Sequence, residues 1–369
     1  MSKATETVLE IDLKALEHNY RYLKSKLKPS TKFMGVVKAF GYGSDAVEIS
    51  KKLVQLKVDY LAVAYVKEGV ALREAGIEVP ILVLHPQAVN FDVLLKCHLE
   101  PSLYSPKILK AFLQLVKEQH IKAYPIHLKF NTGLNRLGFL EQDVDDIVQH
   151  LKNNESVKVV SVFSHMAASE DAKEAPFTTA QIALFDKISN DIVERLGCKP
   201  LKHILNTSGI LNFPEAQYDM VRSGIGLYGF GNNAKIDLEL RPVATLKTII
   251  SQLHKIAPHE SVGYNRDFKA TGYSITATLP IGHADGIRRQ YGNNKISVLV
   301  GGKKAPIIGN VCMDMIMIDV TGLDCNEGDE VIIFGNDPTA EEFAYAGNTI
   351  SYELLTGISQ RVKRKYINA

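Results

Sequence analysis

The sequence lacks the marks of a disulfide-bonded, metal-binding or membrane-inserted protein. It has four cysteines in 369 residues, and none of them forms a CxxC pair or stands at zinc-ligand spacing. We therefore expect no disulfide framework and no metal site, but reduced, buried thiols in a cytoplasmic protein. No apolar run approaches the ~18 residues that a membrane-spanning helix needs. The opening residues, MSKATETVLEIDL, lack the apolar core of a signal peptide.

The chain also lacks an excess of charge of either sign. Lysine and arginine number 43 and aspartate and glutamate 41, which leaves a net charge of +2. Such a balance gives no field that would attract nucleic acid or an anionic membrane. With 46% hydrophobic and 23% charged residues, the composition is that of an ordinary globular enzyme. At roughly 100–200 residues per domain, the length predicts two domains.

Several catalytic motifs are missing as well. The sequence contains no GxGxxG turn, no GxSxG elbow and no cluster of carboxylates or of Cys and His at metal-ligand spacing. The candidates that remain are lysines, arginines, histidines and tyrosines. This inventory suits an enzyme that holds an aldehyde cofactor, such as pyridoxal phosphate (PLP), on a lysine.

Short apolar runs alternate with longer helical patterns from about residue 31 to residue 229. The apolar positions of LEQDVDDIVQHLKNN fall at i, i+3, i+4 and i+7, which places one apolar stripe on a helix. The segment TTAQIALFDKISNDIVERLGCK repeats this pattern, and Gly197 is a plausible helix stop. The apolar runs, rich in Val and Ile as buried parallel strands are, are KFMGVVKA, DYLAVAYV, PILVLHP, LEPSLY, YPIHLKF, VKVVSVFSHM, KHILNTS and YDMVRSGIGLYG.

About eight strand-then-helix units is the number that closes a parallel barrel. An open doubly wound sheet is the competing architecture, but it usually carries a glycine-rich dinucleotide turn after its first strand. We therefore predict an α/β fold with an N-terminal (β/α)8 TIM-like barrel over residues 10–232.

The rhythm changes after Gly229. GNNAKIDLELRPV indicates a linker, and strands joined by turns follow in ATLKTIISQLHKI, YSITATLPIG, KISVLVGGKKAPIIGNVCMDMIMIDV and DEVIIFG. Long helices are missing there. We predict a second, mostly β domain over residues 233–369, with residues 1–9 pairing with it.

Polar side chains follow the ends of several predicted barrel strands, where the catalytic residues of such barrels lie. A lysine or histidine at a strand end is commonly only solvated or hydrogen-bonded, so the convergence of several of them is the informative observation. Gly224, Ile225 and Gly226 follow one strand and could present backbone N–H groups to a cofactor phosphate. The strand-end candidates are Lys38, Lys129, His165, His203, Asn206, Thr207 and Arg222.

Nine motifs occur in order over nearly the whole chain, and together they carry a family resemblance. They are VVKAFGYG, HLKFNTGLNRLGF, FSHMA, HILNTSG, VRSGIGLYG, SVGYNRDF, IGHADG, GNVCMD and TISYELLTGISQRVKR. The chain resembles the alanine racemases, PLP enzymes built from a barrel and a β domain. The resemblance implies interconversion of L- and D-alanine, a supply of D-alanine for peptidoglycan and a cytoplasmic location.

The resemblance also assigns roles near the reacting carbon. Lys38 would hold PLP covalently and act as one base, while Tyr264 would be the second base on the opposite face of the substrate. Removing a proton from one face and returning one to the other suits two fixed bases better than a single mobile one. Arg222 would donate to the pyridine nitrogen, and since arginine keeps its proton, the ring would be a weaker electron sink. His165 would lie near the ring.

Further roles follow from the same resemblance. Arg136 would contact the substrate carboxylate, and Lys129 matches a lysine that is often carbamylated and then orients Arg136. His203 would support Tyr264 or Arg222 from behind. From the β domain, Met313 and Asp314 would reach the substrate pocket. The cofactor phosphate would be held by Tyr42, Asn206, Thr207, Gly224, Ile225 and Tyr352.

The sequence departs from the common family pattern without losing a group that moves a proton. Asn131 replaces an aspartate near Lys129, and His283 replaces a tyrosine in the xADG turn, which bears on rate and substrate tolerance. The other departures are Phe40, Ser44, Leu134, Thr207 and Asn265.

Three alternatives stay open at this point. A decarboxylase of similar build would typically place a carboxylate, not Arg222, at the pyridine nitrogen. A non-catalytic PLP-binding barrel would need neither the β domain nor Tyr264. A racemase of another small amino acid, such as serine, is compatible with every motif. The resemblance further implies a head-to-tail homodimer whose active sites are shared between chains.

Overall fold

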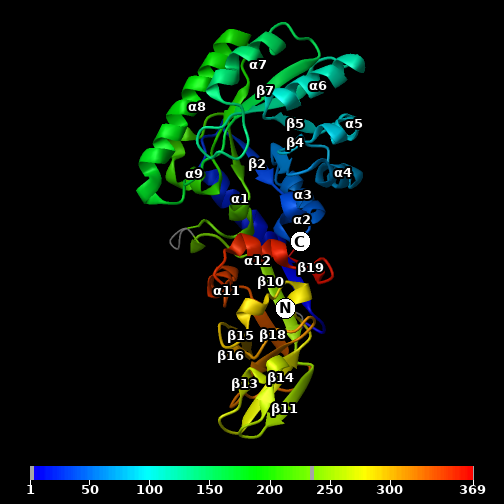
Figure 1. Cartoon of the computed structure of the whole chain (residues 1–369), viewed down its shortest axis with the longest axis vertical. Coiled ribbons are helices and arrows are strands. Elements are labelled where there is room, and N and C mark those ends of the chain that lie inside the picture. Colours follow the sequence, from blue (N-terminus) through cyan, green and yellow to red (C-terminus); the bar gives the residue numbers. More distant parts are fainter. Residues whose placement is uncertain (1–3, 233–236, 369) are drawn as a thin grey trace. The chain divides into compact units, whose positions relative to one another are not determined.

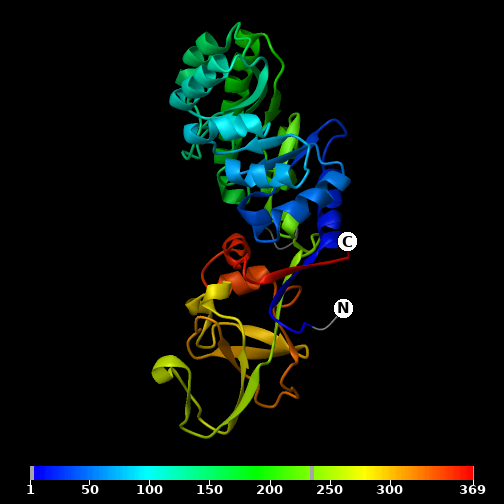
Figure 2. The ribbon, with the colours of Figure 1, turned by 90° about the vertical axis from the view of Figure 1, so that its right-hand side faces the viewer.

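The computed structural model describes residues 4–232 and 237–368, and it divides into two compact units (Figures 1 and 2). One unit comprises Glu17–Gly41 and Ala46–Leu240, and the other comprises Met1–Leu16, Tyr42–Asp45 and Arg241–Ala369. Residues 233–236 of the expected linker lie outside the described residues. The domain boundaries expected from the sequence, at residues 10 and 232, stay a prediction.

The first unit is a nearly closed parallel barrel. Its sheet follows the order β8-β7-β6-β5-β4-β3-β2-β9, so neighbours in the sheet are neighbours in the chain, and β9 returns to pair with β2. Backbone hydrogen bonds from Asp219 to Lys202 and from Arg222 to Leu205, both 3.1 Å, bridge the seam between the last two strands. The strands are β2 (Lys32–Val36), β3 (Tyr60–Val63), β4 (Ile81–Val83), β5 (Glu100–Leu103), β6 (Tyr124–Lys129), β7 (Val157–Phe163), β8 (Leu201–His203) and β9 (Met220–Ser223).

This order confirms the predicted barrel and excludes the doubly wound alternative, because a doubly wound sheet reverses its strand order at a switch point. Each of the eight apolar runs overlaps one barrel strand. Helices lie on the outside of the strands (Figure 1). They include α1 (Leu13–Ser25), α3 (Ala46–Gln55), α4 (Val66–Glu74), α5 (Phe91–Lys96), α6 (Pro106–Glu118), α7 (Val144–Leu151), α8 (Ala175–Leu196) and α9 (Thr207–Asn212).

Two helices illustrate how local sequence places these elements. In α7 the predicted stripe is the buried face, formed by Val144, Ile147, Val148 and Leu151. Helix α8 ends at Gly197, whose backbone is left-handed with φ 62°, as expected for a glycine that stops a helix. No helix among the described residues is both long and apolar enough to cross a membrane.

The second unit is built on a nine-stranded sheet with the order β11-β14-β17-β16-β15-β18-β10-β1-β19 and a separate pair, β12 and β13. The N-terminal strand β1 lies between β10, to which it is antiparallel, and β19, to which it is parallel. The strands are β1 (Val8–Asp12), β10 (Ala244–Ile249), β11 (Gln252–Ile256), β12 (Ser261–Val262), β13 (Phe268–Lys269), β14 (Ser274–Leu279), β15 (Ser297–Val300), β16 (Lys303–Ile308), β17 (Ile316–Asp319), β18 (Glu330–Phe334) and β19 (Lys363–Ile367).

The expected β character of this unit is confirmed, with two short helices, α11 (Ala340–Ala346) and α12 (Ser351–Gly357). One expected strand is divided: ATLKTIISQLHKI forms β10 and β11, which lie far apart in the sheet order. A hairpin joins β15 and β16 through Gly301 and Gly302. Their φ angles of 56° and 77° show why both turn residues are glycine.

Candidate active site

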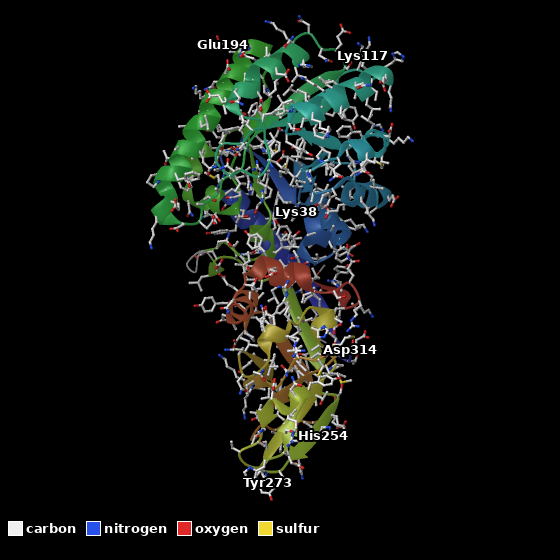
Figure 3. The ribbon with its side chains drawn as sticks, viewed as in Figure 1. Lys38, Lys117, Glu194, His254, Tyr273 and Asp314 are labelled. Carbon is white, nitrogen blue, oxygen red and sulfur yellow. The ribbon has the colours of Figure 1, made fainter. Side chains whose placement is uncertain are left out.

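Lys38 stands two residues beyond strand β2 (labelled in Figure 3), at the start of an unusual turn. Residues 39–42, in the segment labelled α2 (Lys38–Tyr42), have φ angles of 53°, 55°, 60° and 51°. A left-handed backbone costs a non-glycine residue about 1–2 kcal/mol, so only Gly41 adopts it without strain. Consecutive strained residues need external support, and they mark the strand end as a functional candidate.

Glu68, near the start of helix α4, supplies part of that support. Its Oε1 accepts a hydrogen bond of 2.7 Å from the backbone N–H of Ala39. Its Oε2 accepts from the N–H groups of Ala64 and Tyr65, at 2.7 and 3.1 Å. One carboxylate therefore joins the turn after Lys38 to the loop after β3. The sequence analysis missed Glu68, although a glutamate three residues into a helix is a recognisable capping signal.

Arg222 is the best-anchored cation of the barrel unit. It is 5% exposed, and its Nη1 donates to Nδ1 of His203 at 2.5 Å. Its Nη2 donates to the carbonyl of Ser164 at 2.7 Å and to Nδ1 of His165 at 3.1 Å. Its Nε–H donates to no atom of the described residues. The two terminal nitrogens of the guanidinium are thus held by the protein, and the Nε–H is left to donate to a ligand.

Phe163, at the end of β7, completes the surroundings of Arg222. Its ring stacks on the imidazole of His203, with centroids 4.8 Å apart and planes 4° from parallel. The guanidinium carbon of Arg222 lies 5.3 Å from the same ring centroid. Burial, with Arg136 nearby, lowers the pKa of Arg222 to about 9, so the group remains cationic at neutral pH.

The barrel residues near Arg222 form a concentration of positive charge. Burial and the charges of Arg136, Arg222 and Lys38 lower the pKa of Lys129 to about 8. Burial and Arg136 likewise lower the pKa of Lys38, although Glu68 opposes the shift. Cations that depress one another's protonation in this way provide a site for anions, such as a phosphate or an amino-acid carboxylate.

Hydroxyl and amide groups gather beside β9. The Oγ1 of Thr207 lies 3.0 Å from the Oγ of Ser223 and accepts from the N–H of Gly226 at 3.3 Å. A Cβ on Gly226 would lie 2.5 Å from Thr207, so only glycine fits there. Asn206 holds this corner by accepting a 2.8 Å hydrogen bond from Gly209 N–H at the start of α9. The buried residues Gly224 and Ile225 follow β9 directly.

Asn131, which departs from the family pattern, hydrogen-bonds within the loop that follows Lys129. Its side-chain oxygen accepts from the N–H groups of Gly133 and Asn135, at 3.2 and 2.9 Å. An aspartate would offer the same acceptor. Arg136, farther along this loop, is exposed.

In the sheet unit, Tyr264 and Met313 lie at the surface, 66% and 60% exposed. A pocket of about 530 Å³ is lined by Gly263, Tyr264, Thr278, Cys312, Met313, Asp314, Met315 and Met317. In the same unit, the ring centroids of Tyr42 and Tyr352 lie 6.1 Å apart. Burial and the neighbouring Tyr352 raise the pKa of Tyr42, so its hydroxyl keeps its proton.

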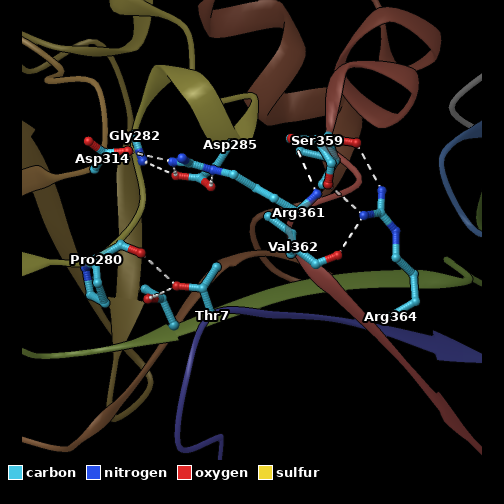
Figure 4. A network of polar contacts seen from close by, with 11 residues as sticks. Thr7, Pro280, Gly282, Asp285, Asp314, Ser359, Arg361, Val362 and Arg364 are labelled. Atoms are coloured by element: carbon cyan, nitrogen blue, oxygen red, sulfur yellow. Dashed lines mark hydrogen bonds and ion pairs between the residues drawn. The ribbon is translucent and has the colours of Figure 1, made fainter.

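An arginine that the sequence analysis missed fixes the segment that carries Met313 (Figure 4). Arg361 makes a two-pronged ion pair with Asp285, at 2.6 and 3.0 Å, and bonds Asp314 at 2.7 Å. The N–H of Ala284 donates to the carbonyl of Met313 at 3.0 Å. The xADG turn, the CMD segment and the C-terminal SQRVKR segment are therefore one structural unit around Arg361.

Comparison with known proteins identifies this arrangement. Residues 11–231 match the alanine racemase N-terminal domain, and residues 243–366 match the alanine racemase C-terminal domain. The chain belongs to the alanine racemase family. The family assignment expected from the motifs is thus confirmed, as is the expectation that the chain is an isomerase of this kind.

Individual alanine racemases are similar over nearly the full length. Alanine racemase 2 of Caldanaerobacter subterraneus subsp. tengcongensis is 38% identical, over 98% of this chain and 95% of that protein. The solved alanine racemase of Clostridium difficile 630 is 35% identical with a TM-score of 0.93, covering 99% of this chain and 97% of that one. The alanine racemase of Bartonella henselae, solved with covalently bound pyridoxal phosphate, is 29% identical with a TM-score of 0.89, covering 99% and 100%.

Seen as an alanine racemase, the chain groups its expected site residues by unit. Hydrogen bonds or charge connect five residues of the barrel unit, which are Lys38, Lys129, His165, His203 and Arg222. Arg136 acts through charge on all of these except His203. In the sheet unit, Tyr264, Met313 and Asp314 share one pocket.

We predict that Glu68→Gln lowers kcat for alanine racemisation by about tenfold and lowers the thermal unfolding midpoint. A hydrogen bond to a charged group contributes about 1.5–3 kcal/mol, and a neutral amide cannot accept from all three N–H groups. Glu74→Gln, an exposed change on the same helix, is the matched control. Equal rates and midpoints in the two variants would show that Glu68 does not hold the Lys38 turn.

Proposed function

We propose that this protein interconverts L- and D-alanine with pyridoxal phosphate bound through Lys38. The observation that carries this proposal is the guanidinium of Arg222, which is held from behind by His203, His165 and Ser164 and keeps its Nε–H for a ligand. A neutral aromatic ring nitrogen is an acceptor for such a donor. The covalent pyridoxal phosphate in the Bartonella henselae enzyme supports the same assignment.

The bound cofactor would supply an electron-withdrawing ring that acidifies the α-hydrogen of alanine. Nζ of Lys38 would then take or return the proton on one face, and the hydroxyl of Tyr264 would do so on the other. The lowered pKa of Lys38 supports this role, because an amine must be neutral to accept a proton. Arg136 would hold the substrate carboxylate.

The remaining site residues would hold the phosphate and shape the pocket. The hydroxyl of Thr207 and the backbone N–H groups of Gly224 and Ile225 suit a phosphate, and Asn206 would keep this corner in place. Tyr42 and Tyr352 would add hydroxyl donors. Met313 would contact the substrate. Asp314, through its bond to Arg361, would hold the segment that carries Met313 in place.

Arg222 also separates this proposal from its rivals. A cation whose pKa is about 9 donates a hydrogen bond at neutral pH but gives up its proton reluctantly. The pyridine nitrogen would stay unprotonated, which disfavours the strong electron sink that decarboxylation uses. The β domain carries the exposed Tyr264 and Met313, which a catalytic protein would use and a non-catalytic PLP-binding barrel would not need. A role in D-alanine supply for peptidoglycan and a cytoplasmic location stay predictions.

We expect the purified protein with pyridoxal phosphate to racemise L-alanine faster than L-serine, as followed by chiral chromatography. Borohydride reduction followed by peptide mapping should place the cofactor on Lys38. Lys38→Ala should abolish both the racemisation and the labelled peptide. A label on Lys129 would overturn the assignment of Lys38. Faster turnover of serine would change the substrate while leaving the cofactor chemistry in place.

We propose further that Lys129 is carbamylated. A carbamate forms when a neutral amine attacks carbon dioxide, and a pKa of about 8 leaves a sizeable neutral fraction near pH 8. The product is an anion, so the cations Arg136 and Arg222 that depress the amine's protonation would stabilise it. The carbamate would in turn orient Arg136.

With 13C-bicarbonate present, the wild-type protein should show a carbamate carbon signal that Lys129→Ala lacks. The neutral fraction of the amine rises with pH, so at equal concentrations of dissolved carbon dioxide, activity lost on removing carbon dioxide should recover faster at pH 8.5 than at pH 6.5. Lys122→Ala, an exposed lysine paired at 4.0 Å with Glu155, serves as the control. A bare amine at Lys129 under saturating bicarbonate would reject the modification.

We also propose a head-to-tail homodimer in which Tyr264 and Met313 of one chain complete the site around Lys38 of the other. The exposure of both side chains supports this, because a catalytic tyrosine and an apolar neighbour need a covering surface. Such sharing would make each site depend on two chains.

A complementation experiment tests the shared site. Lys38→Ala and Tyr264→Phe chains should each be nearly inactive, and mixing them under subunit exchange should restore about half the wild-type activity per heterodimer, because one of its two sites carries no lesion. If every site were built within one chain, both sites of the heterodimer would stay damaged and no activity would return. Exchange is confirmed independently by mass spectrometry.

A further inference from the structure

A continuous chain of polar side chains crosses the interior of the barrel. Strands β5 to β9 each contribute one member in order: Glu100, His127, Ser161, His203 and Arg222. The contacts are 2.7 Å from Glu100 Oε2 to His127 Nε2, 2.6 Å from His127 Nδ1 to Ser161 Oγ, and 2.9 Å from Ser161 Oγ to His203 Nε2. The last contact, from His203 Nδ1 to Arg222 Nη1, is 2.5 Å.

The chain is shielded from water. His127, Ser161 and His203 have no exposed surface, Arg222 is 5% exposed, and the side chain of Glu100 is 12% exposed. Buried polar groups that fail to pair carry a cost of about 1–3 kcal/mol each. Every hydrogen in this chain therefore has a preferred position.

The two ends determine those positions. Arginine has only donors, so Nδ1 of His203 must accept from Arg222, and the neutral imidazole carries its hydrogen on Nε2. That Nε2–H donates to the oxygen of Ser161, whose hydroxyl hydrogen then points to Nδ1 of His127. Nε2–H of His127 donates to the carboxylate of Glu100, which has only acceptors when ionised.

The reverse direction fails at Arg222. If His127 carried hydrogen on Nδ1, Ser161 would receive it and donate to Nε2 of His203. A neutral His203 would then carry hydrogen on Nδ1, facing the Nη1–H of Arg222 at 2.5 Å. Two donors at that distance repel each other, so a permanent acceptor at Glu100 and a permanent donor at Arg222 select one direction.

Other groups also surround Glu100. Burial and the Glu100 carboxylate raise the pKa of Tyr60, and the T-shaped contact between Tyr60 and His127 has centroids 6.1 Å apart. Arg73 and Tyr124 interact electrostatically with the same carboxylate. Glu100 is the first residue of β5 and so lies at the N-terminal end of the strand. Barrel residues at that end ordinarily serve stability rather than catalysis.

We propose that Glu100 is a positioning residue for the reaction: acting through His127 and Ser161, it holds His203 as the Nε2–H tautomer that anchors Arg222, the proposed donor to the pyridine nitrogen of the cofactor. The inference rests on the proposed function for the role of Arg222. The hydrogen-bond direction itself is a property of the protein alone. Each member increases the polarity of the next, since hydrogen bonds in series polarise one another.

The experiment uses protein labelled with 15N at histidine, with and without pyridoxal phosphate. The His203 resonances, assigned from their loss in His203→Asn, should report hydrogen on Nε2 and a hydrogen-bonded acceptor at Nδ1. Glu100→Gln, which keeps shape and removes charge, should shift the His203 Nδ1 resonance. That shift should vanish when Ser161→Ala breaks the chain.

Kinetics supply the second readout. Glu100→Gln and Ser161→Ala should each lower kcat by about three- to tenfold with little change in KM, and the double variant should be no worse than Ser161→Ala, as for residues that act in one chain. The matched control is Ser102→Ala, which removes another buried barrel hydroxyl that has no hydrogen-bond partner among the described residues. The Glu100→Gln effects should persist in that background.

Three results would overturn the proposal: hydrogen on Nδ1 of His203, no His203 shift in Glu100→Gln, or additive kinetic losses in the double variant. Circular dichroism checks that each variant folds, and Ser161→Cys, with a weak thiol donor of similar size, replaces Ser161→Ala if the latter unfolds. Because the NMR readout is available without cofactor, a protein with no racemase activity would contradict the proposed function and leave the tautomer result standing.

Discussion

A buried guanidinium that stays protonated at neutral pH is the constraint around which the barrel interior is organised. Arg222 donates to two histidines and to backbone carbonyls, which are acceptors that keep the cation in place without adding a neutralising carboxylate beside it. The nearest carboxylate along this path is Glu100, separated from Arg222 by three uncharged side chains. The carboxylate charge of Glu100 is therefore kept away from the cofactor site. Its influence on Arg222 passes only through the direction of the hydrogen bonds between them.

The site of the barrel unit is consequently rich in cations. Burial, together with the charge of Arg136, lowers the pKa values of Lys38, Lys129 and Arg222, and the charges of Arg222 and Lys38 add to the shift at Lys129. An anionic cofactor, an amino-acid carboxylate and a carbamate would each relieve this repulsion. Affinity for anions and neutral lysine amines thus have the same physical origin.

Backbone strain is concentrated in the turn directly after Lys38. The left-handed turn after Lys38 is unfavourable for three of its four residues, and Glu68 opposes this by receiving an N–H from the turn. The sheet unit shows a similar economy, since Arg361 fixes both Asp285 and Asp314 around the segment that presents Met313. In each case one charged side chain links segments distant in sequence.

Local patterns were sufficient to predict the barrel strands, the buried face of α7 and the stop at Gly197. Periodicity, glycine conformation and strand burial act over a few residues, so a single sequence reveals them. The motifs likewise pointed to Lys38, Arg222 and Tyr264, because chemically demanding residues stand in recognisable local contexts. The same reasoning treated ATLKTIISQLHKI as one strand, since nothing local shows that β10 and β11 take distant places in the sheet.

Other features were decided only by the tertiary structure. No distinctive spacing marks Glu100, His127, Ser161 or Arg361, and their roles arise from strands and loops that meet only in the folded barrel or sheet. Glu68 stands at a recognisable capping position, but its contact with the turn after Lys38 exists only in the folded barrel. The direction of the hydrogen bonds from Arg222 to Glu100 depends on five strands lying side by side in one order. The sequence determined which groups could donate, accept or carry charge, whereas the fold determined which of them meet, because hydrogen bonds and ion pairs act over a few ångströms of space regardless of separation along the chain.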